Sequence, residues 1–508
     1  MISTWDDLPA EIRLLILEAL VQDGCTLSPL TTVSREWQTK LERYNFARIR
    51  LTPSRLVDFG SMIYRNRALV RYIWFCLELD NYDCTICAPA HDEEAFVVSD
   101  TDHCPITTAF QNLFSTLSTW EPVRDLILDI SIYSPSDSKH WFPYLTFMPD
   151  TPSGILGGDG GIERMVLNKV YHDPHHGWVA GFGRSAPPAS AIRKVFHSVM
   201  GEGPFNSDRL EIEWWDQLPS VPAVTSLLLR QQNYRRWKPG SLAHMFARFP
   251  RLQEVHYEPW REWDSMQGLT DRDFQYLFEA IPRFNNDLKR LVVFENFNQR
   301  YPANMQQFLN GVDIAGCDII RNPAPAVSRR VALASLKLEH LAASFIVDAS
   351  DFFKIEPSWE WPHLSSLVLT SNLLTPDENP IEIGAMLQAA AAAALKMPQL
   401  ETMEIWNGRK GLAALFKYQA FRNTQQATIL WRGTWTLAMD PSTIEAWEAV
   451  VYQYNGKLNL VQERLDEAAI KSHGDAIHYL MLSSQVIRPI SLQQIRIEQK
   501  ALDSLEAG

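Results

Sequence analysis

A short apolar pattern that recurs through the middle of the chain constrains the fold more than any other feature. From residue 70 to about residue 419, β-like runs alternate with helical or loop segments. Several runs share the pattern Leu-x-x-Leu-x-Leu or a close variant, as at residues 288–293, 364–369 and 400–405. Runs of this length with alternating apolar positions are typical of buried strands. Helical segments that end next to a proline precede several of the runs, so the predicted unit is helix, proline, strand, turn.

The spacing of these units indicates how they assemble. The predicted strands start about 28 to nearly 50 residues apart, so the chain resembles irregular leucine-rich repeats rather than a strict array. One such unit cannot bury its own apolar face, and neighbouring units must stack on one another. The resemblance implies a curved solenoid with parallel strands on one side, helices on the other and a concave face that binds proteins. A plain α/β domain with a parallel sheet is the alternative.

The first fifty residues predict two short helices, each opened by a proline. Pro9 and Pro29 suit the first position of a helix, where no backbone N–H is needed. The apolar positions are Leu8, Ile12, Ile16 and Leu20 on the first helix, and Leu30, Val33 and Trp37 on the second. A unit this small buries too little surface to be stable alone. Its apolar faces must therefore pack either against the rest of this chain or against another protein.

The residue types in this segment resemble a known module. The run Leu8-Pro9-x-Glu11-Ile12, followed by Leu30-x-x-Val33-Ser34-Arg35-x-Trp37, resembles the F-box, and residues 5–13 resemble F-box proteins of filamentous fungi. The resemblance implies that residues 5–50 dock on the Skp-type adaptor of a cullin ubiquitin ligase, while a second domain presents a protein substrate. It places eight residues in the adaptor contact: Leu8, Pro9, Ile12, Ile16, Leu20, Leu30, Val33 and Trp37. It does not say which of them hold the module together instead.

The sequence thus predicts an α/β chain in three parts. Residues 1–50 form the helical F-box module, and residues 51–420 form an irregular leucine-rich-repeat-like domain that binds the substrate. Residues 421–508 form a small α+β region. We expect this last region to cap the stack, because a repeat array needs an end piece that covers its last apolar face.

Aromatic and basic side chains gather near the predicted strands between residues 214 and 263. The aromatic ones are Trp214, Trp215, Tyr234, Trp237, Tyr257, Trp260 and Trp263, and the basic ones are Arg230, Arg235, Arg236 and Lys238. Trp, Tyr and Arg are the usual anchors of protein interfaces, which favours this segment as a contact surface. The simpler interpretation, in which the rings are core and the basic groups are solvated, stays open.

Composition and charge exclude several classes of protein. There are 60 acidic and 47 basic residues, and the formal net charge of -13 argues against general binding to nucleic acid or to anionic membranes. No apolar run approaches the ~20 residues that span a bilayer, and the start lacks the segments of a signal peptide. Six cysteines in 508 residues are too few for a disulfide scaffold. We therefore expect reduced thiols and a cytoplasmic or nuclear location.

The sequence contains no recognised catalytic motif. It has no Gly-x-Ser-x-Gly elbow, no His-Glu-x-x-His pair and no phosphate-binding Gly-Lys-Ser/Thr loop. We therefore expect a non-catalytic protein without a cofactor or a bound metal.

Two clusters contain residue types that can bind a metal ion. The first is Cys84-x-x-Cys87 with His91, His103 and Cys104, of which only the cysteine pair has the spacing of a zinc half-site. A pair of structural thiols is the favoured interpretation. The second is His172-Asp173-Pro174-His175-His176. The alternatives to a ligase subunit are an interaction scaffold with no ligase role, and a metal-dependent enzyme that uses the first cluster.

Overall fold

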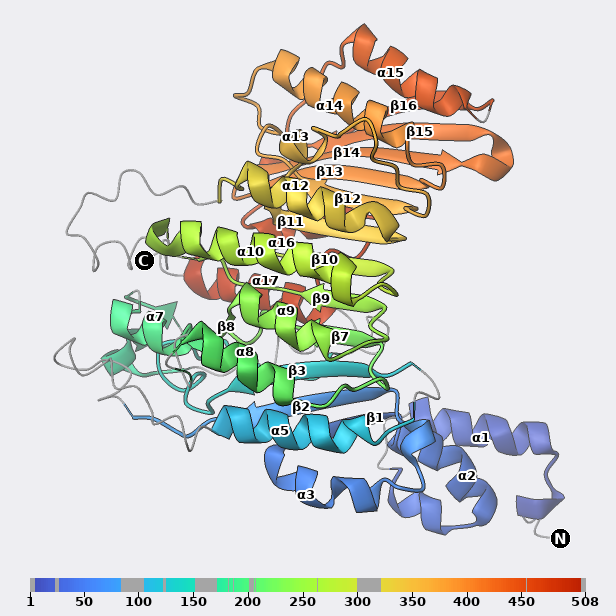
Figure 1. The fold of residues 1–508 in the computed structure, drawn as a ribbon, viewed down its shortest axis with the longest axis vertical. Helices are drawn as coiled ribbons and strands as arrows, with labels where there is room; N and C mark the ends of the chain where they lie inside the picture. The colour runs from blue at the N-terminus through green and yellow to red at the C-terminus, as the bar shows by residue number, and fades with distance from the viewer. Residues whose placement is uncertain are drawn as a thin grey trace.

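The structure is a computed structural model. It describes residues 5–22, 27–83, 105–121, 125–150, 171–180, 182–185, 187–200, 205, 207–262, 264–298, 321–453 and 455–503. This part of the chain folds into a mixed α/β structure with fourteen α-helices and one large sheet of twelve strands (Figure 1). The expected α/β class with parallel strands is confirmed.

The strands lie in the sheet in the same order as in the chain. They are β1 (Arg48–Leu51), β2 (Tyr72–Glu78), β3 (Ile127–Tyr133), β7 (Ser226–Leu229), β9 (Glu254–Tyr257), β10 (Arg290–Phe294), β11 (His340–Asp348), β12 (Ser366–Thr370), β13 (Thr402–Arg409), β14 (Leu412–Phe421), β15 (Gln426–Gly433) and β16 (Lys457–Arg464). Neighbours are parallel throughout, except that β14 runs antiparallel to both β13 and β15. Because β14–β16 hydrogen-bond into the same sheet, the sheet continues across the expected boundary at residue 420.

The recurring apolar pattern explains why these strands stack. The second apolar residue of each run is in register with that of the next, so Leu291 pairs with Leu341 and Leu341 with Leu367. All three are buried in one core that also contains the buried faces of the helices. In a strand, alternate residues share a face, so the last residue of the pattern lies on the same side. The apolar residues of the pattern therefore form the contact between the sheet and its helices.

A repeated hydrogen-bond pattern holds the amino-terminal ends of the strands. The carbonyl of Gln253, just before β9, accepts from the backbone N–H groups of both Lys289 and Arg290 at the start of β10. The carbonyls of Leu126, Thr225, Lys289, Glu339 and Ser365 each accept in the same way from two successive N–H groups of the next unit. The same local geometry thus recurs from unit to unit, although the units differ in length.

A layer of helices covers one face of the sheet (Figure 1). It contains α3 (Pro53–Met62), α5 (Pro105–Ser118), α8 (Asp208–Gln217), α9 (Pro239–Ala247), α10 (Asp264–Phe284), α12 (Pro325–Ala334), α14 (Pro380–Ala394) and α15 (Pro441–Tyr452). Six of these begin with proline, the residue that suits a first helical position. One helix differs from expectation, because α10 continues through Pro282 to Phe284 instead of ending before the proline.

Smaller elements fill the remaining connections. They are α7 (Ala189–Val195), α13 (Ala349–Phe352), the pair β4 (Trp178–Val179) and β5 (Phe182–Gly183), the parallel pair β6 (Ser198–Met200) and β8 (Arg236–Trp237), and the 3-10 turns Arg67–Leu69, Pro174–His176, Ser335–Lys337, Arg422–Thr424 and Glu467–Ala469. No helix among the described residues is long and apolar enough to cross a bilayer.

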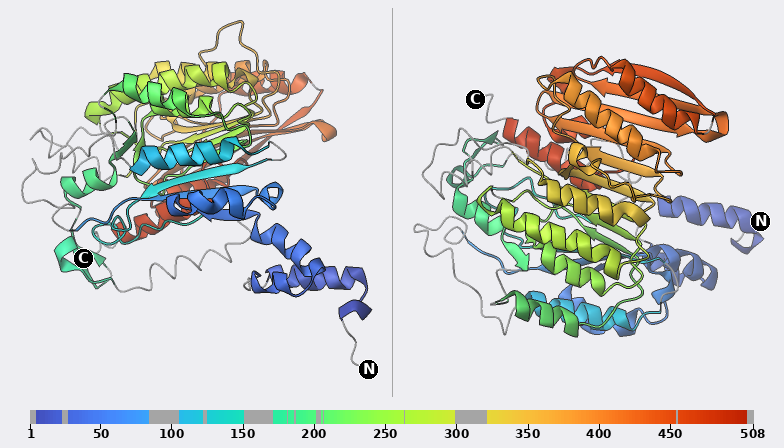
Figure 2. Two further views of the ribbon diagram at one scale, coloured as in Figure 1. Left: turned by 60° about the horizontal axis from the view of Figure 1, so that its bottom comes forward. Right: turned by 45° about the horizontal axis from the view of Figure 1, so that its top comes forward.

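The last residues of the chain cross the second face of the sheet. They form α16 (His473–Leu480) and α17 (Pro489–Asp503), which lie on the side opposite the helix layer (Figures 1 and 2). Leu480 is buried in a second core with Phe345 and Trp406 of the sheet side. The described residues between 421 and 503 thus extend the far end of the sheet and also cover a face that we expected to be open.

The N-terminal helices project from the opposite end of the sheet. A 3-10 turn (Trp5–Asp7), α1 (Ala10–Gln22), a second 3-10 turn (Pro29–Thr32) and α2 (Arg35–Asn45) stand away from the main body (Figure 2). Only Phe46 and Ala47 separate α2 from β1, and the carbonyl of Ala47 accepts from the N–H groups of Arg71 and Tyr72. The projecting helices are therefore joined to the sheet by a short connection that is itself hydrogen-bonded.

Candidate functional site

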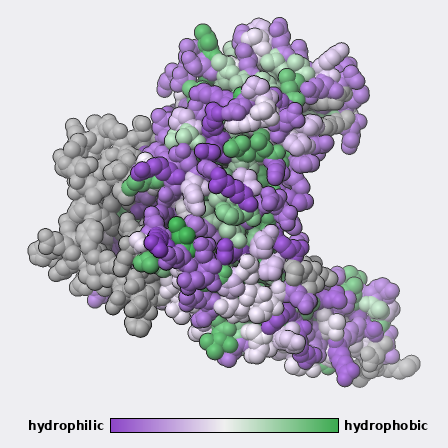
Figure 3. All heavy atoms as spheres, viewed as in Figure 1, coloured by the Kyte–Doolittle hydropathy of each residue, from purple (hydrophilic) through white to green (hydrophobic). Residues whose placement is uncertain are grey.

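Helix α1 carries apolar side chains around most of its circumference. Nine of its 13 residues are apolar, yet Leu17 is the only one of the helix that is buried. Ile12 is 43% exposed, Leu15 59% and Ile16 36%. A helix that is apolar on all sides is normally covered by other protein. The described part of this chain leaves most of α1 uncovered, and hydrophobic residues lie on the surface of this end of the molecule (Figure 3).

The eight residues assigned to an adaptor contact fall into two groups. Pro9, Ile12, Ile16 and Val33 are exposed, while Leu8, Leu20, Leu30 and Trp37 are half-buried. Leu15 is not among the eight, although its helical spacing places it on the same face as Ile12. Ile12, Leu15, Ile16 and the exposed Ala19 follow one line along the helix. We call these four residues the outer stripe of α1.

Other contacts hold the two N-terminal helices together. The rings of Trp5 and Trp37 lie 5.0 Å apart, and Nε1 of Trp5 donates to Glu36 at 3.1 Å. Arg13 forms an ion pair with Glu36 at 3.2 Å. Leu41 of α2 is fully buried. Trp37 therefore serves the packing of the module itself, and the outer stripe is left for contacts elsewhere.

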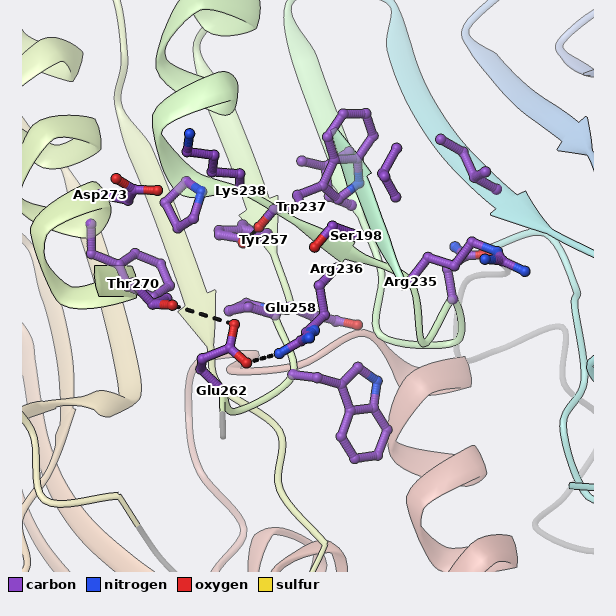
Figure 4. A pocket seen from close by; sticks show the side chains of 18 of the residues that line it. Ser198, Arg235, Arg236, Trp237, Lys238, Tyr257, Glu258, Glu262, Thr270 and Asp273 are labelled. Carbon is purple, nitrogen blue, oxygen red and sulfur yellow. Dashed lines mark hydrogen bonds and ion pairs between the residues drawn. The ribbon is translucent and has the colours of Figure 1, made fainter. Parts of the chain in front are cut away.

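A second candidate site is a cavity at the carboxyl ends of β3, β7 and β9. Its volume is about 530 Å³, and the short strands β6 and β8 and the amino-terminal half of α10 complete its walls (Figure 4). The carboxyl ends of parallel strands meet at one edge of a sheet, so residues far apart in the sequence come together there. This volume is within the usual range for ligand pockets, about 300–1,000 Å³.

Ion pairs occupy most of the charged groups around this cavity. Arg236 pairs with Glu262, whose other oxygen accepts a hydrogen bond from Thr270 at 3.3 Å (Figure 4). Lys238 pairs with Asp208, and Arg235 lies 3.4 Å from Asp137. The cavity is therefore bordered by opposite charges that already neutralise one another.

A buried ion pair lies beneath the cavity and fixes Arg230. Its guanidinium is 2.8 Å from the carboxylate of Asp129, and both side chains are fully buried. Burial raises the pKa of Asp129, and the charge of Arg230 opposes that rise. The hydroxyl of Tyr72 donates to the same carboxylate. This arrangement satisfies the charges within the protein, so we assign it a structural role.

The aromatic residues expected to anchor an interface are mostly core. Trp214, Trp215, Tyr234, Tyr257 and Trp260 are buried, and Trp237 is half-buried. Trp237, Tyr257 and Trp260 also line the cavity, as do the basic residues of the same segment, Arg230, Arg235, Arg236 and Lys238. Trp263 lies outside the described residues. The simpler interpretation thus holds for most of the rings, and the cavity is where the others and the basic groups meet.

The histidine cluster forms hydrogen bonds within the protein. Nδ1 of His140 lies 3.2 Å from Nε2 of His176, and Nδ1 of His176 lies 2.6 Å from Asp173. Burial and the neighbouring His176 lower the pKa of His140. Within the described ranges no three His, Cys, Asp or Glu side chains are placed to hold a metal ion. The candidate ligands Cys84, Cys87, His91, His103 and Cys104 lie outside those ranges.

The thiol of Cys76 is placed unfavourably for chemistry. It lies in β2, fully covered, and burial raises its pKa to about 12. A thiol needs to lose its proton to act as a nucleophile or metal ligand. We therefore assign it to packing.

Comparison with known proteins places one part of the chain. Residues 281–488 match the model of a family of unknown function, DUF6546. The match runs from the end of α10 through α16, so the N-terminal module and the residues that line the cavity lie outside it. No curated protein matches the chain.

Proposed function

We propose that this protein is a non-catalytic, substrate-recruiting subunit of a Skp/cullin/F-box ubiquitin ligase, acting in the cytoplasm or nucleus. Its N-terminal module would bind the Skp-type adaptor, and its repeat domain would bind a protein substrate. The observation that carries this proposal is the outer stripe of α1, an apolar surface that projects from the body without a covering element in the described residues.

The energetics of this surface fit a protein partner. Burying one Leu, Ile or Val side chain contributes roughly 1.5–3 kcal/mol, and association costs several kcal/mol at least. Ile12, Leu15, Ile16 and Val33, together with the half-buried Leu8 and Leu30, supply enough apolar surface to exceed that cost. Such a patch left in water would favour aggregation, which is a reason to expect a permanent partner.

The sheet supports the finer assignment of an irregular leucine-rich-repeat-like solenoid. The strands follow chain order, each unit adds one strand and usually one helix, and in most units one carbonyl accepts two successive N–H groups from the next unit. Repeat proteins are built in this way, from units that contact only their neighbours. A body of this kind, joined to the module by two residues, would hold a substrate at a set orientation to the adaptor.

Co-purification with a fungal Skp-type adaptor tests the proposal. We expect the full chain to bind the adaptor, and we expect the double substitution Ile12→Asp and Leu15→Asp to abolish binding, because each would place a charge in the apolar contact. The matched control is Ile381→Asp, since Ile381 is 77% exposed on α14, in the main body. The control should bind as the unmodified chain does.

Two results would contradict this assignment. Loss of binding in the control would mean that any exposed apolar-to-acid change disturbs the protein. If the unmodified chain does not bind the adaptor, the alternative of a repeat scaffold without a ligase role gains support. Circular dichroism of all three proteins shows whether the main body keeps its fold.

A further inference from the structure

The face of a solenoid that usually binds partners is filled in this protein. Leu228, Val292, Ala342 and Val368 point to the second face of the sheet, and none is more than 4% exposed. Apolar residues of α16 pack on the strands β10–β14, while Phe147 stacks on Tyr133 at the β3 end, with ring centroids 4.1 Å apart.

Polar contacts reinforce this cover. Arg488 forms an ion pair with Asp150 and donates its backbone N–H to Glu258 at 2.7 Å. Gln231 donates to the carbonyl of Ser491 at 2.9 Å, and Ser483 donates its N–H to Glu404 at 2.8 Å. A surface tied down by both apolar and charged contacts is part of the core, so a substrate has to bind elsewhere on the repeat domain.

The cavity at the carboxyl ends of β3, β7 and β9 offers such a place. Apolar groups from five elements form part of its walls: Ile130, Leu229, Tyr257, Trp237 and Phe274. Half-exposed residues of α10, such as Leu269, lie at its rim. The cavity is large enough for more than one amino-acid side chain, which suits a segment of peptide.

The charges of the cavity indicate what kind of side chain it takes. Its cations Arg230, Arg235, Arg236 and Lys238 are each paired with a carboxylate, and the fifth, Arg272, is exposed on α10. Its carboxylates Asp208 and Glu262 are used in those pairs, and Glu258 accepts two backbone N–H groups.

Asp273 is the exception. It is half-buried in the cavity wall next to Gly240 at the start of α9, and within the described residues it accepts no hydrogen bond and forms no ion pair (Figure 4). Burial raises its pKa and nearby Lys238 opposes the rise, as expected for a carboxylate that is partly desolvated without a direct counter-charge. The side-chain oxygen of Asn233, also in the lining, is buried without a donor. Asp273 and Asn233 can therefore each accept a hydrogen bond from a ligand, whereas the buried, unpartnered Nε of Arg235 belongs to a guanidinium that already pairs with Asp137.

We propose that this cavity is the substrate-recognition site, and that it takes an arginine or lysine side chain of a protein substrate, with Asp273 as the acceptor. The aliphatic stem of such a side chain packs on the rings of Trp237 and Tyr257, which also favour a cation near their faces. The net charge of -13 attracts basic segments toward the protein as a whole. Only the identification of the ligand as a ligase substrate rests on the proposed function. The expected binding of a basic side chain does not depend on the adaptor.

A peptide library tests the inference. The probes are N-acetylated, C-amidated heptapeptides with uncharged random flanks and a central arginine, lysine, citrulline or glutamate. Citrulline matches arginine in shape but is uncharged. We expect the full-length chain to retain arginine and lysine peptides, with affinities at least about tenfold above those of the citrulline peptides, because a hydrogen bond to a charged group is lost.

Variants of one residue locate the contact. Asp273→Asn keeps the shape of the side chain and should lower affinity for the arginine peptides at least about tenfold. Asp273→Glu keeps the charge and should retain the preference for arginine over citrulline. The matched control is Asp58→Asn, which removes the same charge from an exposed position on α3 and should leave binding unchanged.

Each remaining outcome overturns the inference. It is overturned if arginine and citrulline peptides are retained equally, or if Asp273→Asn binds as tightly as the control. It is also overturned if no peptide of any class is retained. The adaptor assay separates this result from the proposed function. Ile12→Asp with Leu15→Asp should leave peptide binding intact, and Asp273→Asn should leave adaptor binding intact, so each can fail alone.

Discussion

The two ends of the chain carry short helices with apolar residues, and the protein uses them differently. At the N-terminus, Ile12 and Leu15 of α1 face away from the body. At the C-terminus, Ala476 and Leu480 of α16 are fully buried beside Phe345. An apolar helical face therefore predicts that other protein covers it, but not whether that protein is the same chain or a partner.

Polar contacts distinguish the two ends as clearly as the apolar ones do. The C-terminal segment reaches charged groups of the main body, as Arg488 does with Asp150 and Glu258. The N-terminal module satisfies its polar groups internally, as Arg13 and Trp5 do with Glu36. One end is therefore integrated into the core, and the other is a separate unit on a short connection.

The largest expected effect is on the C-terminal side. Leu480→Ala should lower the free energy of unfolding by about 2–5 kcal/mol, because it removes a fully buried side chain from a packed core. Urea denaturation followed by tryptophan fluorescence measures this change. A loss below about 0.5 kcal/mol, the range of surface substitutions, would show that α16 is a detachable cover and would weaken the contrast.

A pH dependence should follow from the same helix. Nε2 of His473 lies 2.7 Å from Oδ1 of Asn296, and burial lowers the pKa of His473 to about 3, from 6.5 in the unfolded chain. Below pH 6.5 the unfolded chain binds a proton that the folded chain does not accept until much lower pH. Stability should therefore fall by about 2 kcal/mol between pH 7 and pH 5 from this residue.

The variant His473→Gln isolates that contribution. Glutamine can donate to Asn296 but does not titrate, so the variant should lose about 2 kcal/mol less than the unmodified chain over the same interval. Urea denaturation at the two pH values supplies the difference. Identical pH dependence in both proteins would mean that the imidazole of His473 takes up a proton as readily in the folded chain as in the unfolded chain.

The smallest expected effect on stability is at the other end. Leu15→Ala should change the free energy of unfolding by less than about 0.5 kcal/mol, because Leu15 is 59% exposed. The same variant should weaken adaptor binding about tenfold, as expected for an apolar anchor within an interface. Denaturation and titration with the adaptor give the two numbers. A large loss of stability would place Leu15 inside the fold and remove the contrast between the two ends.

The strands that carry the apolar pattern could be predicted from the sequence because the pattern acts locally. Each Leu-x-x-Leu-x-Leu run carries its own strand length and buried face, and parallel stacking follows from units that cannot bury that face alone. Proline was a less reliable guide. The helix α10 continues past Pro282, with Ile281 and Phe278 buried, since packing on the core outweighs the local preference for ending there.

The two candidate sites differed in how far they could be predicted. The outer stripe follows from spacing within one helix, and the sequence assigned its members Ile12 and Ile16 to the adaptor contact, but not Leu15 or Ala19. The cavity draws on residues from Ile130 to Phe274, which no local pattern connects. The sequence indicated a contact surface from its basic and aromatic members. It gave no sign of Asp273, because only the fold decides which charged groups pair with one another.

The sequence by itself determined the α/β class, the parallel strands that carry the apolar pattern and the apolar character of both chain ends, since these depend on residues a few positions apart. Tertiary structure alone decided that α16 and α17 fill the second face of the sheet, that α1 stays outside, and that Asp273 in the cavity wall has no ion-pair partner among the described residues. These outcomes depend on which surfaces meet after folding, and side chains far apart in the chain compete for the same contacts.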